Sequence, residues 1–350
     1  MASENARFSP SRRRLMQIAT MGTVIAGTSA LTTAASATAD NTIFPADFSY
    51  PAITGPSLAL WGSSSFAGAR ATDGVPLGLD ARIESLLTAE LNVPVLNFGR
   101  GGEFSHNIAT RRGVSALTTK LVFPHHMIPA SGTVQVSLEQ DSPIRWNTAT
   151  FFPGFIQDIP GVITAVDQAE GSYLFTRMQE GDERYAPAGT PANHFYSYQE
   201  MISRSSHHVI QVGRNNLTDV DLIIKHTQQC FDLAPTRTLV MGHFRADGDA
   251  PDSERAKNTL AYNEWGAQTY GENFMNTEQW IFEASQDPAY RYGEIADAKV
   301  WEKKSDRKAE TEKRIPRSLY SSDGLHLNGW GYILMARMLQ AKITELGWYQ

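Results

Sequence analysis

Apolar residues along this chain occur in short runs that alternate with longer stretches of helical spacing. The short runs predict β-strands and cover residues 57–61, 93–99, 207–213 and 236–244. Each run is followed by a stretch with apolar residues three or four positions apart, and these predicted helices cover residues 79–91, 105–113, 219–234 and 253–271. Strands and helices that alternate in this way predict a parallel sheet covered by helices.

The pattern changes between about residues 121 and 198. Short runs at residues 133–140, 161–168 and 172–179 are separated by Pro, Gly and Asp, the residues of tight turns. This segment therefore predicts a β-rich insertion within the α/β domain. A last helix is predicted over residues 329–348, where apolar residues again have helical spacing.

The first 39 residues have the three parts of a cleavable export signal. Three arginines at positions 12–14 precede an uncharged run over residues 15–39, which ends in small residues before Asp40. The segment SRRRLM resembles the twin-arginine export motif. Thr and Ser interrupt the run too often for a good membrane-spanning helix. We expect the twin-arginine export machinery to be a partner of this chain and residues 1–39 to be cleaved. The expected product is a secreted, periplasmic or cell-wall protein of residues 40–350 without a stable membrane anchor.

Charge and cysteine content narrow the functional classes. The formal net charge is -6, and no long basic run lies in the body of the chain, so nucleic acid is not an expected partner. The sequence has one cysteine, Cys230, which excludes an internal disulfide and a cysteine-rich zinc site. Its position in a predicted helix indicates a buried apolar residue. The charged stretch 301–314 mixes both signs and predicts a solvated helix or loop.

Four short polar segments stand where an α/β protein of this layout has its active loops. They are residues 62–68 (GSSSFAG), 97–103 (NFGRGGE), 213–216 (GRNN) and 323–326 (DGLH). The first three directly follow predicted strands, and the fourth precedes the last helix. In open α/β sheets, ligands bind at the carboxyl ends of the strands. We therefore expect the four segments to meet there.

Each segment contains a residue type suited to acyl transfer. A serine on a tight strand-to-helix turn can expose a nucleophilic hydroxyl, although three serines also make an ordinary polar turn. Gly99, Gly101 and Gly102 allow a backbone N–H to approach an oxyanion. Phe104 stands where the dinucleotide-binding pattern has its third glycine, so that pattern is not met. Asn215 offers a carboxamide donor. Asp323 can orient His326 as a general base, but His326 alone is equally typical of a structural histidine.

The set of four segments resembles the SGNH (GDSL-like) hydrolase family, over most of the chain from Leu58 to its end except the insertion. The resemblance implies a flavodoxin-like three-layer α/β/α sandwich. It also implies that Ser64 is the nucleophile, that Asp323 and His326 complete a triad, and that the oxyanion donors are the N–H groups of Ser64 and Gly102 and the side chain of Asn215.

Two positions depart from the family pattern. The usual Gly-Asp-Ser is here Gly62-Ser63-Ser64, and the usual Gly-x-Asn-Asp ends in Asn216. Neither altered position is the nucleophile or a triad member in the family. If the alignment shifts by one residue, however, the reactive hydroxyl is that of Ser63 or Ser65.

The resemblance implies an exported serine esterase that works through an acyl-enzyme and needs neither a metal nor an organic cofactor. Export and the insertion favour an ester of acylated carbohydrate or another small extracellular ester as substrate. A lipase or phospholipase-type acyl hydrolase and a glycan acyltransferase would use the same triad. A different class of function is a catalytically silent glycan-binding protein on a hydrolase scaffold.

Other candidate sites have weaker patterns. The pairs His125-His126 and His207-His208 would point apart on strands, so they do not predict a metal site. The acidic loop over residues 247–252 lacks the glycine and the final glutamate of a calcium loop.

Two further groups of residues have alternative interpretations. Arg100, Glu103 and His106 either contact substrate or stabilise their loop. Aromatic residues of the insertion either line a binding cleft or form the core of the insertion, and they are Trp146, Phe151, Phe152, Phe155, Tyr173 and Phe175.

Overall fold

The computed structural model describes residues 56–139, 151–167 and 172–349. The described residues all belong to one compact unit, Ala52–Gln350. The expected export signal and Trp146 lie outside the described residues, as do the side chains of Phe151 and Asp167.

A five-stranded parallel sheet forms the centre of the α/β part. Its strands are β1 (Leu58–Trp61), β2 (Val95–Asn97), β11 (His207–Ile210), β12 (Thr238–Met241) and β13 (Phe274–Met275), in the spatial order β13-β12-β11-β1-β2. Counted along the chain, this is the order 2-1-3-4-5 of flavodoxin-like folds, whose binding crevice lies between the first and third strands. The sequence pattern predicted four of these strands. It did not predict β13, because two residues are too few to show a periodicity.

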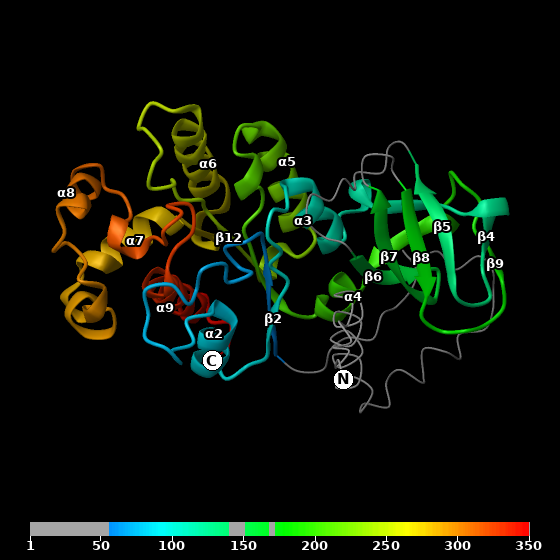
Figure 1. The fold of residues 1–350 in the computed structure, drawn as a ribbon, viewed down its shortest axis with the longest axis horizontal. Helices are drawn as coiled ribbons and strands as arrows, with labels where there is room; N and C mark the ends of the chain where they lie inside the picture. Colours follow the sequence, from blue (N-terminus) through cyan, green and yellow to red (C-terminus); the bar gives the residue numbers. More distant parts are fainter. Residues whose placement is uncertain (1–55, 140–150, 168–171, 350) are drawn as a thin grey trace, which may run out of the picture. The chain divides into compact units, whose positions relative to one another are not determined.

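Helices cover both faces of the sheet (Figure 1). One layer contains α2 (Ile83–Leu91), α7 (Thr277–Gln286) and α9 (Gly329–Glu345), and the other contains α3 (Ser105–Arg112), α5 (Val220–Asp232) and α6 (Glu254–Tyr270).

Strand side chains alternate between the two helical layers, as the period of two requires. Leu58 and Leu60 belong to the apolar core of the first layer, whereas Ala59 and Trp61 belong to that of the second. The predicted three-layer α/β/α sandwich is confirmed.

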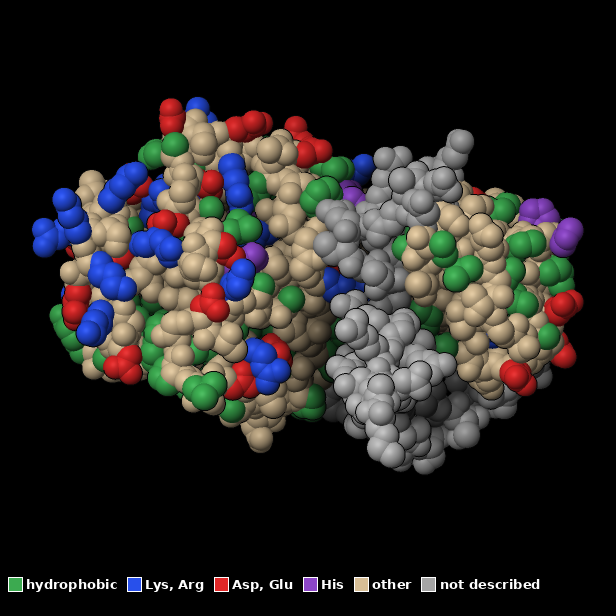
Figure 2. Space-filling view, viewed as in Figure 1, with side chains coloured by type: hydrophobic (Ala, Val, Ile, Leu, Met, Phe, Trp, Pro, Cys, Tyr) green, Lys and Arg blue, Asp and Glu red, His purple; other side chains and the backbone are tan. Residues whose placement is uncertain are grey.

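Two further features also match their sequence patterns. The charged stretch contains α8 (Lys304–Thr311), and side chains of both charge signs are interspersed over this region in Figure 2. Cys230 is fully buried in α5, and burial raises the pKa of its thiol to about 12. Both predictions are confirmed.

The insertion is a closed antiparallel barrel in the order β10-β3-β5-β8-β7-β6. Its strands are β3 (Thr119–Val122), β5 (Thr133–Leu138), β6 (Phe151–Ile156), β7 (Ile159–Asp167), β8 (Ser172–Arg177) and β10 (His194–Ser197). A separate pair, β4 (Met127–Ile128) and β9 (Arg184–Tyr185), lies between barrel strands in the sequence, and α4 (Tyr198–Ser203) follows β10. The predicted runs became β5, β7 and β8. Strand β6 was not predicted because Pro153 and Gly154 interrupt it.

The described aromatic residues of the insertion serve mainly as its core. Phe152, Tyr173 and Phe175 are almost completely buried within the barrel. Phe155 is partly buried and stacks on Tyr198 of α4, with 6.2 Å between the ring centroids. For these residues, packing within the protein is therefore the better interpretation.

The prediction that His125 and His126 lie on a strand is wrong. Both residues belong to a 3₁₀ turn, Pro124–His126, and have φ angles of 53° and 58°. His207 and His208 do lie on β11 and point to opposite faces, where His207 stacks on Trp348 and His208 contacts Trp61.

Among the described residues, no group of three or more His, Cys, Asp or Glu side chains is arranged to hold a metal ion. In the acidic loop, Asp247 pairs with Arg317 at 3.1 Å and Asp249 with Arg255 at 3.7 Å. No helix within the described ranges combines the length and apolar character needed to cross a membrane.

Candidate active site

The turn after β1 holds Ser64 at the carboxyl edge of the sheet. Its backbone is closed by the N–H of Ala67, which donates to the Ser63 carbonyl, and by the N–H of Ala69, which donates to the Ser64 carbonyl. Gly62 is required at the start, because a Cβ there would lie 2.4 Å from the buried ring of Phe66. The turn therefore has one tightly packed conformation, which fixes the direction of each serine side chain.

The three serines of this turn have different surroundings. Ser63 and Ser65 are 0% and 1% exposed, and their hydroxyls have no hydrogen-bond partner among the described residues. The Ser64 Oγ lies 2.8 Å from Nε2 of His326, although 262 positions separate the two residues in the sequence. Ser64 is thus the serine whose hydroxyl can pass its proton to an imidazole.

Asp323 orients His326 from the opposite side of its ring. Oδ2 of Asp323 lies 2.8 Å from Nδ1 of His326. The other carboxylate oxygen, Oδ1, accepts hydrogen bonds from the backbone N–H groups of Leu325 and His326, at 2.8 and 3.0 Å, and from the Ser321 hydroxyl, at 2.7 Å. With Oδ1 held by three donors, the carboxylate presents Oδ2 to the histidine in a fixed direction.

Hydrogen bonding keeps Asp323 ionised. Burial alone would raise the pKa of its carboxyl group, but the bonds from the His326 ring, the backbone and Ser321 lower it more. The pKa of Asp323 therefore lies well below its usual range. A carboxylate in this position stabilises an imidazolium while the histidine carries a proton.

Arg70 is a neighbour of the triad that the sequence pattern did not indicate. Its Nε lies 3.5 Å from Oδ2 of Asp323, and the side chain is 53% exposed. The backbone of Arg70 has a φ of 68°, which is uncommon for a residue with a side chain. No periodicity or spacing identifies such a residue, because its position results from the irregular loop after the Ser64 turn.

The glycine-rich turn after β2 lies against Ser64. The N–H of Arg100 donates to the Gly62 carbonyl at 3.1 Å, which joins the two turns directly. The N–H of Glu103 donates to the Arg100 carbonyl at 3.4 Å, and Gly102 has a φ of 77°, as the third residue of a type II turn requires. A Cβ on Gly101 would lie 4.0 Å from that of Ser64, so the turn backbone approaches the serine closely.

Asn215 reaches the same glycine-rich turn from β11. It lies in a 3₁₀ turn, Arg214–Asn216, and its Nδ2 donates to the Glu103 carbonyl at 2.9 Å. A carboxamide nitrogen carries two N–H donors, and this bond uses one of them. The structure therefore brings Gly102 and Asn215 to one turn beside Ser64, and the Glu103 carbonyl connects them.

A buried ion pair anchors the glycine-rich turn to α3. Glu103 and Arg111 have side chains that are each 3% exposed, and Nε of Arg111 lies 2.9 Å from Oε1 of Glu103. Arg111 also donates to the side chain of Gln199 in α4 at 2.6 Å. For Glu103, the interpretation as a residue that stabilises its loop is therefore the better one.

Asn97 joins the two turns at the ends of β1 and β2. Its Nδ2 donates to the Phe66 carbonyl at 2.6 Å, and its Oδ1 accepts from the N–H of Gly99 at 2.9 Å. A side chain at position 99 would lie 2.3 Å from the backbone nitrogen of Ala67, so only glycine allows this approach.

Asn216, which departs from the family pattern, has a structural role. Its Oδ1 accepts from the backbone N–H of Ser105 at 3.0 Å, and its Nδ2 donates to the Ser105 hydroxyl at 3.1 Å. The hydroxyl also lies 2.8 Å from Nδ1 of His226. A carboxamide provides both the acceptor and the donor that this contact needs, whereas a carboxylate provides acceptors only.

Comparisons with known proteins found a structural similarity but no sequence match. No family model matches the chain, and no curated protein matches its sequence. One solved structure, described as a member of the lipolytic protein G-D-S-L family from Veillonella parvula DSM 2008, is similar over 83% of this chain and 97% of its own, with 14% sequence identity and a TM-score of 0.38. A similarity of this quality does not establish a shared family or activity.

Proposed function

We propose that this protein is an exported serine esterase that hydrolyses acyl esters, with Ser64 as nucleophile, His326 as general base and Asp323 as the orienting carboxylate. The proposal rests on one observation above all, the continuous chain of contacts from Asp323 through His326 to Ser64, with 2.8 Å at each step. Nucleophile, base and orienting group at hydrogen-bonding distance are the arrangement that activates a serine.

Acylation begins with a proton transfer. Nδ1–H of His326 donates to Oδ2 of Asp323, which leaves Nε2 as the acceptor for the Ser64 proton. Ser64 Oγ attacks the ester carbonyl carbon as His326 takes its proton, and the carbonyl oxygen becomes negatively charged. His326 then protonates the departing alcohol, and the acyl group remains on Ser64. Water, activated by the same histidine, releases the acid and restores the serine.

The oxyanion is stabilised by donors at the carboxyl edge of the sheet. The donors are the N–H groups of Ser64 and Gly102 and the N–H of Asn215 that does not bind Glu103. The Ser64 N–H is not used to close its own turn, whose bonds come from Ala67 and Ala69. One donor of this kind contributes about 3–4 kcal/mol to transition-state stabilisation in acyl-transfer enzymes.

The proposed substrate is an ester of acylated carbohydrate or another small extracellular ester, reached after export by the twin-arginine route. Support comes from residues 1–39, whose three parts match an export signal, and from the separate barrel at Thr119–Ser197. Lipase-type hydrolysis and transfer of the acyl group to a glycan use the same three residues, and product analysis with an acceptor sugar separates transfer from hydrolysis.

The second class of function, a silent glycan-binding protein, is disfavoured by the state of the triad. A scaffold without catalysis has no need for the three donors that fix Asp323 Oδ1, or for a serine hydroxyl aligned with Nε2 of His326. Maintaining such a pre-organised group has a purpose only if the serine reacts.

The deciding experiment is hydrolysis of p-nitrophenyl acetate, butyrate and octanoate by the protein from Asp40 onward. We expect turnover by the parent and a loss of about a thousandfold or more in Ser64→Ala and in His326→Ala. Ser63→Ala and Ser65→Ala are matched controls, because each removes a hydroxyl from the same turn that has no contact with His326. The profile over chain length then separates a short-chain esterase from a lipase.

Labelling with a fluorophosphonate gives an independent answer, since only an activated serine reacts quickly. We expect one label per molecule, on Ser64. An inert parent, or full activity in Ser64→Ala, contradicts the proposal and leaves a binding role.

A further inference from the structure

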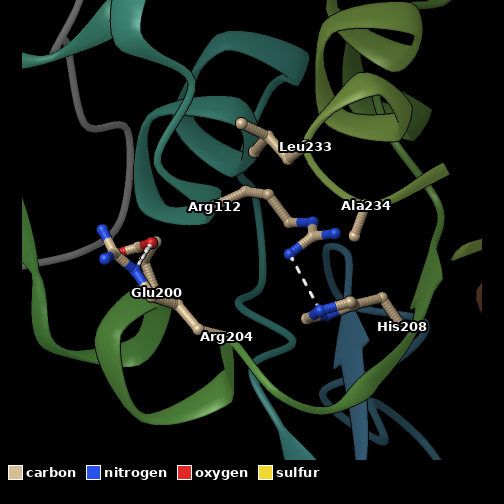
Figure 3. Close-up of a pocket in the computed structure, with 6 residues that line it drawn as sticks. All are labelled: Arg112, Glu200, Arg204, His208, Leu233 and Ala234. Carbon is tan, nitrogen blue, oxygen red and sulfur yellow. Dashed lines mark hydrogen bonds and ion pairs between the residues drawn. The ribbon is translucent and has the colours of Figure 1, made fainter. Parts of the chain in front are cut away.

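A polar cavity lies away from the triad. It has a volume of about 300 Å³ and is lined by Arg112, Glu200, Arg204, His208, Leu233 and Ala234 (Figure 3). His208 is in the first half of β11, and the nearby Thr238 begins β12. The cavity is therefore at the amino ends of parallel strands, whereas Ser64 and Asn215 follow the carboxyl ends. No part of the proposed esterase mechanism uses it.

The hydrogen bonds of His208 are incompatible with one another. Its Nδ1 lies 3.2 Å from the indole N–H of Trp61, and its Nε2 lies 3.4 Å from Nη1 of Arg112. Both neighbours are donors, and neither Trp nor Arg has an acceptor nitrogen. A neutral imidazole accepts at one nitrogen only, so it cannot accept from both. The shorter contact, to the fully buried Trp61, places the His208 proton on Nε2, where it faces Arg112.

Arg112 has no carboxylate in direct contact among the described residues. The side chain belongs to a residue that is 3% exposed, and its Nε–H has no hydrogen-bond partner among the described residues. Its remaining hydrogen-bond contacts are long, 3.4 Å to His208 and 3.4 Å from Nη2 to the hydroxyl of Thr238, and its guanidinium carbon lies 5.5 Å from the ring centroid of Trp61. Figure 3 shows the guanidinium extending from α3 toward His208. A buried guanidinium is normally paired with a carboxylate in direct contact.

The charge around the cavity is mainly positive. Burial first, and then the charges of Arg112 and Arg237, lower the pKa of His208, so the imidazole is neutral. Arg237 donates to the carbonyl of Arg204, which places a third guanidinium close to this end of the sheet. The one carboxylate in the lining, Glu200, binds Arg204 through Oε1, while its buried Oε2 accepts no hydrogen bond from a described residue.

We propose that this cavity is a binding site for a small oxyanion that also carries an O–H group, such as hydrogen phosphate or a 2-hydroxycarboxylate. An anionic oxygen accepts from Nε2–H of His208 and from the guanidinium of Arg112, which satisfies both donors. The O–H of the ligand donates to Oε2 of Glu200, which satisfies the acceptor. The ligand thus supplies the hydrogen bonds that the protein alone leaves unmade.

Two alternatives to a bound anion predict a different result, which is no specific affinity for anions. Water molecules can fill a polar cavity of this size, but they do not compensate the charge of Arg112. Alternatively, the Glu200 carboxylate can turn from Arg204 to Arg112 and close the cavity. In either case the protein has no specific affinity for anions at this position.

The test is thermal unfolding of the mature protein in titrations with potassium phosphate, sulfate, glycolate or acetate, at constant ionic strength set with sodium chloride. A ligand that binds the folded state raises Tm in a saturable way. We expect phosphate to stabilise more strongly than sulfate, and glycolate more strongly than acetate, with half-saturating concentrations that differ by about tenfold or more, because sulfate and acetate cannot donate to Glu200.

Two variants locate the effect. Arg112→Gln is expected to abolish the saturable shift, and Glu200→Gln to remove the preference for phosphate over sulfate. Arg317→Gln is the matched control, since it removes an arginine that pairs with Asp247 elsewhere in the domain. If Arg112→Gln does not fold, nitrogen-15 NMR of the histidine ring in the parent replaces it. We expect the proton of His208 on Nε2, and a change in that resonance as phosphate is added.

The proposal is overturned if none of the four anions gives a saturable rise in Tm above that of sodium chloride. It is also overturned if the shift persists unchanged in Arg112→Gln, or if the His208 proton is on Nδ1.

Discussion

Two histidines at opposite edges of one sheet show how neighbouring groups determine what an imidazole can do. At the carboxyl edge, His326 lies between an acceptor, Asp323, and a hydroxyl, Ser64. At the amino edge, His208 lies between two donors, Trp61 and Arg112. The first set is complementary to a neutral imidazole and fixes one tautomer. The second is not complementary, whichever nitrogen carries the proton.

The difference separates a complete site from an incomplete one. Around His326, each polar atom from Asp323 to Ser64 has a partner within the protein, which is the arrangement that the proposed esterase requires. Around His208, the missing partner is an acceptor, and a cavity of about 300 Å³ lies beside these donors. The matched hydrogen bonds around His326 thus favour a reaction carried out by the protein's own side chains. The unmatched donors around His208 and Arg112 favour a bound ligand that supplies the acceptor.

Neighbouring arginines of α3 repeat the contrast. Arg111 is buried against Glu103 of the glycine-rich turn and against Gln199 of α4. Arg112, the next residue, is equally buried and has no carboxylate in direct contact among the described residues. One helix thus directs a cation paired with a carboxylate toward the glycine-rich turn, and a cation without a contacting carboxylate toward the cavity.

The largest effect is expected from Asp323→Asn. The carboxamide keeps the size of the side chain but can donate to Nδ1, which favours the wrong tautomer of His326, and kcat should fall by about ten-thousandfold. Steady-state kinetics with p-nitrophenyl butyrate measure the loss. Ser321→Ala, which removes one of the three donors to Asp323 Oδ1, should cost far less. A loss below tenfold in Asp323→Asn would show that Asp323 does not orient the base.

Substituting the paired and the unpaired arginine tests the second contrast. Arg111→Met leaves Glu103 buried without a partner and should lower the free energy of unfolding by about 3–5 kcal/mol. Arg112→Met leaves no carboxylate that was in contact, so in buffer without phosphate its cost should be at most about 1 kcal/mol. Urea unfolding measures both values. Equal costs would mean that the charge of Arg112 is already compensated within the protein.

Removal of the Asn215 carboxamide, which contacts the glycine-rich turn, should have the next largest effect, and this effect is on kcat. Asn215→Ala is expected to reduce kcat by about a hundredfold to a thousandfold with little change in KM, because the donor acts mainly in the transition state. Asn258→Ala is the control, since that carboxamide donates to the Leu217 carbonyl in the same region. Equal activity of the parent and Asn215→Ala would exclude Asn215 from the oxyanion site.

Buried histidines should make the fold sensitive to acid. Burial is the main cause that lowers the pKa of His226 to about 4 and of His243 to about 3. In the unfolded chain both have a pKa of about 6.5, so the unfolded state takes up protons first as the pH falls. The full free energy of unfolding is therefore present above about pH 6.5. At pH 5 it should be lower by about 2 kcal/mol for each of these histidines.

Urea unfolding at pH 7.5 and pH 5 checks this expectation. His226→Gln should reduce the pH dependence, while His125→Gln, a substitution of an exposed residue, should leave it unchanged. An unchanged pH dependence in His226→Gln would show that His226 titrates alike in the folded and unfolded states.

Much of the fold could be predicted from the sequence because strands and helices have local periodicities. Buried parallel strands such as β1 and β12 are continuous apolar runs, and the helices that follow them show apolar residues three or four positions apart. The two-residue strand β13 and the Pro-containing strand β6 could not be predicted, because their formation depends on pairing with neighbours rather than on local pattern.

For the site, the sequence provided the residue types and their order, but not their contacts. Asp323 and His326 are three residues apart, close enough for a local prediction that the carboxylate binds the ring. By contrast, the choice of Ser64 over Ser63 and Ser65 depended on the conformation of one turn and on its position relative to a loop 262 residues away.

The sequence by itself thus determined the alternation of strands and helices, the separate insertion and the chemical types at the strand ends, since these are encoded locally. Tertiary structure alone decided which serine meets His326, that Glu103 supports the glycine-rich turn after β2, and that the imidazole of His208 lies between the donors of Trp61 and Arg112. The physical reason is that hydrogen-bond partners between distant segments are set by strand order, helix packing and turn geometry together, and no local pattern contains that information.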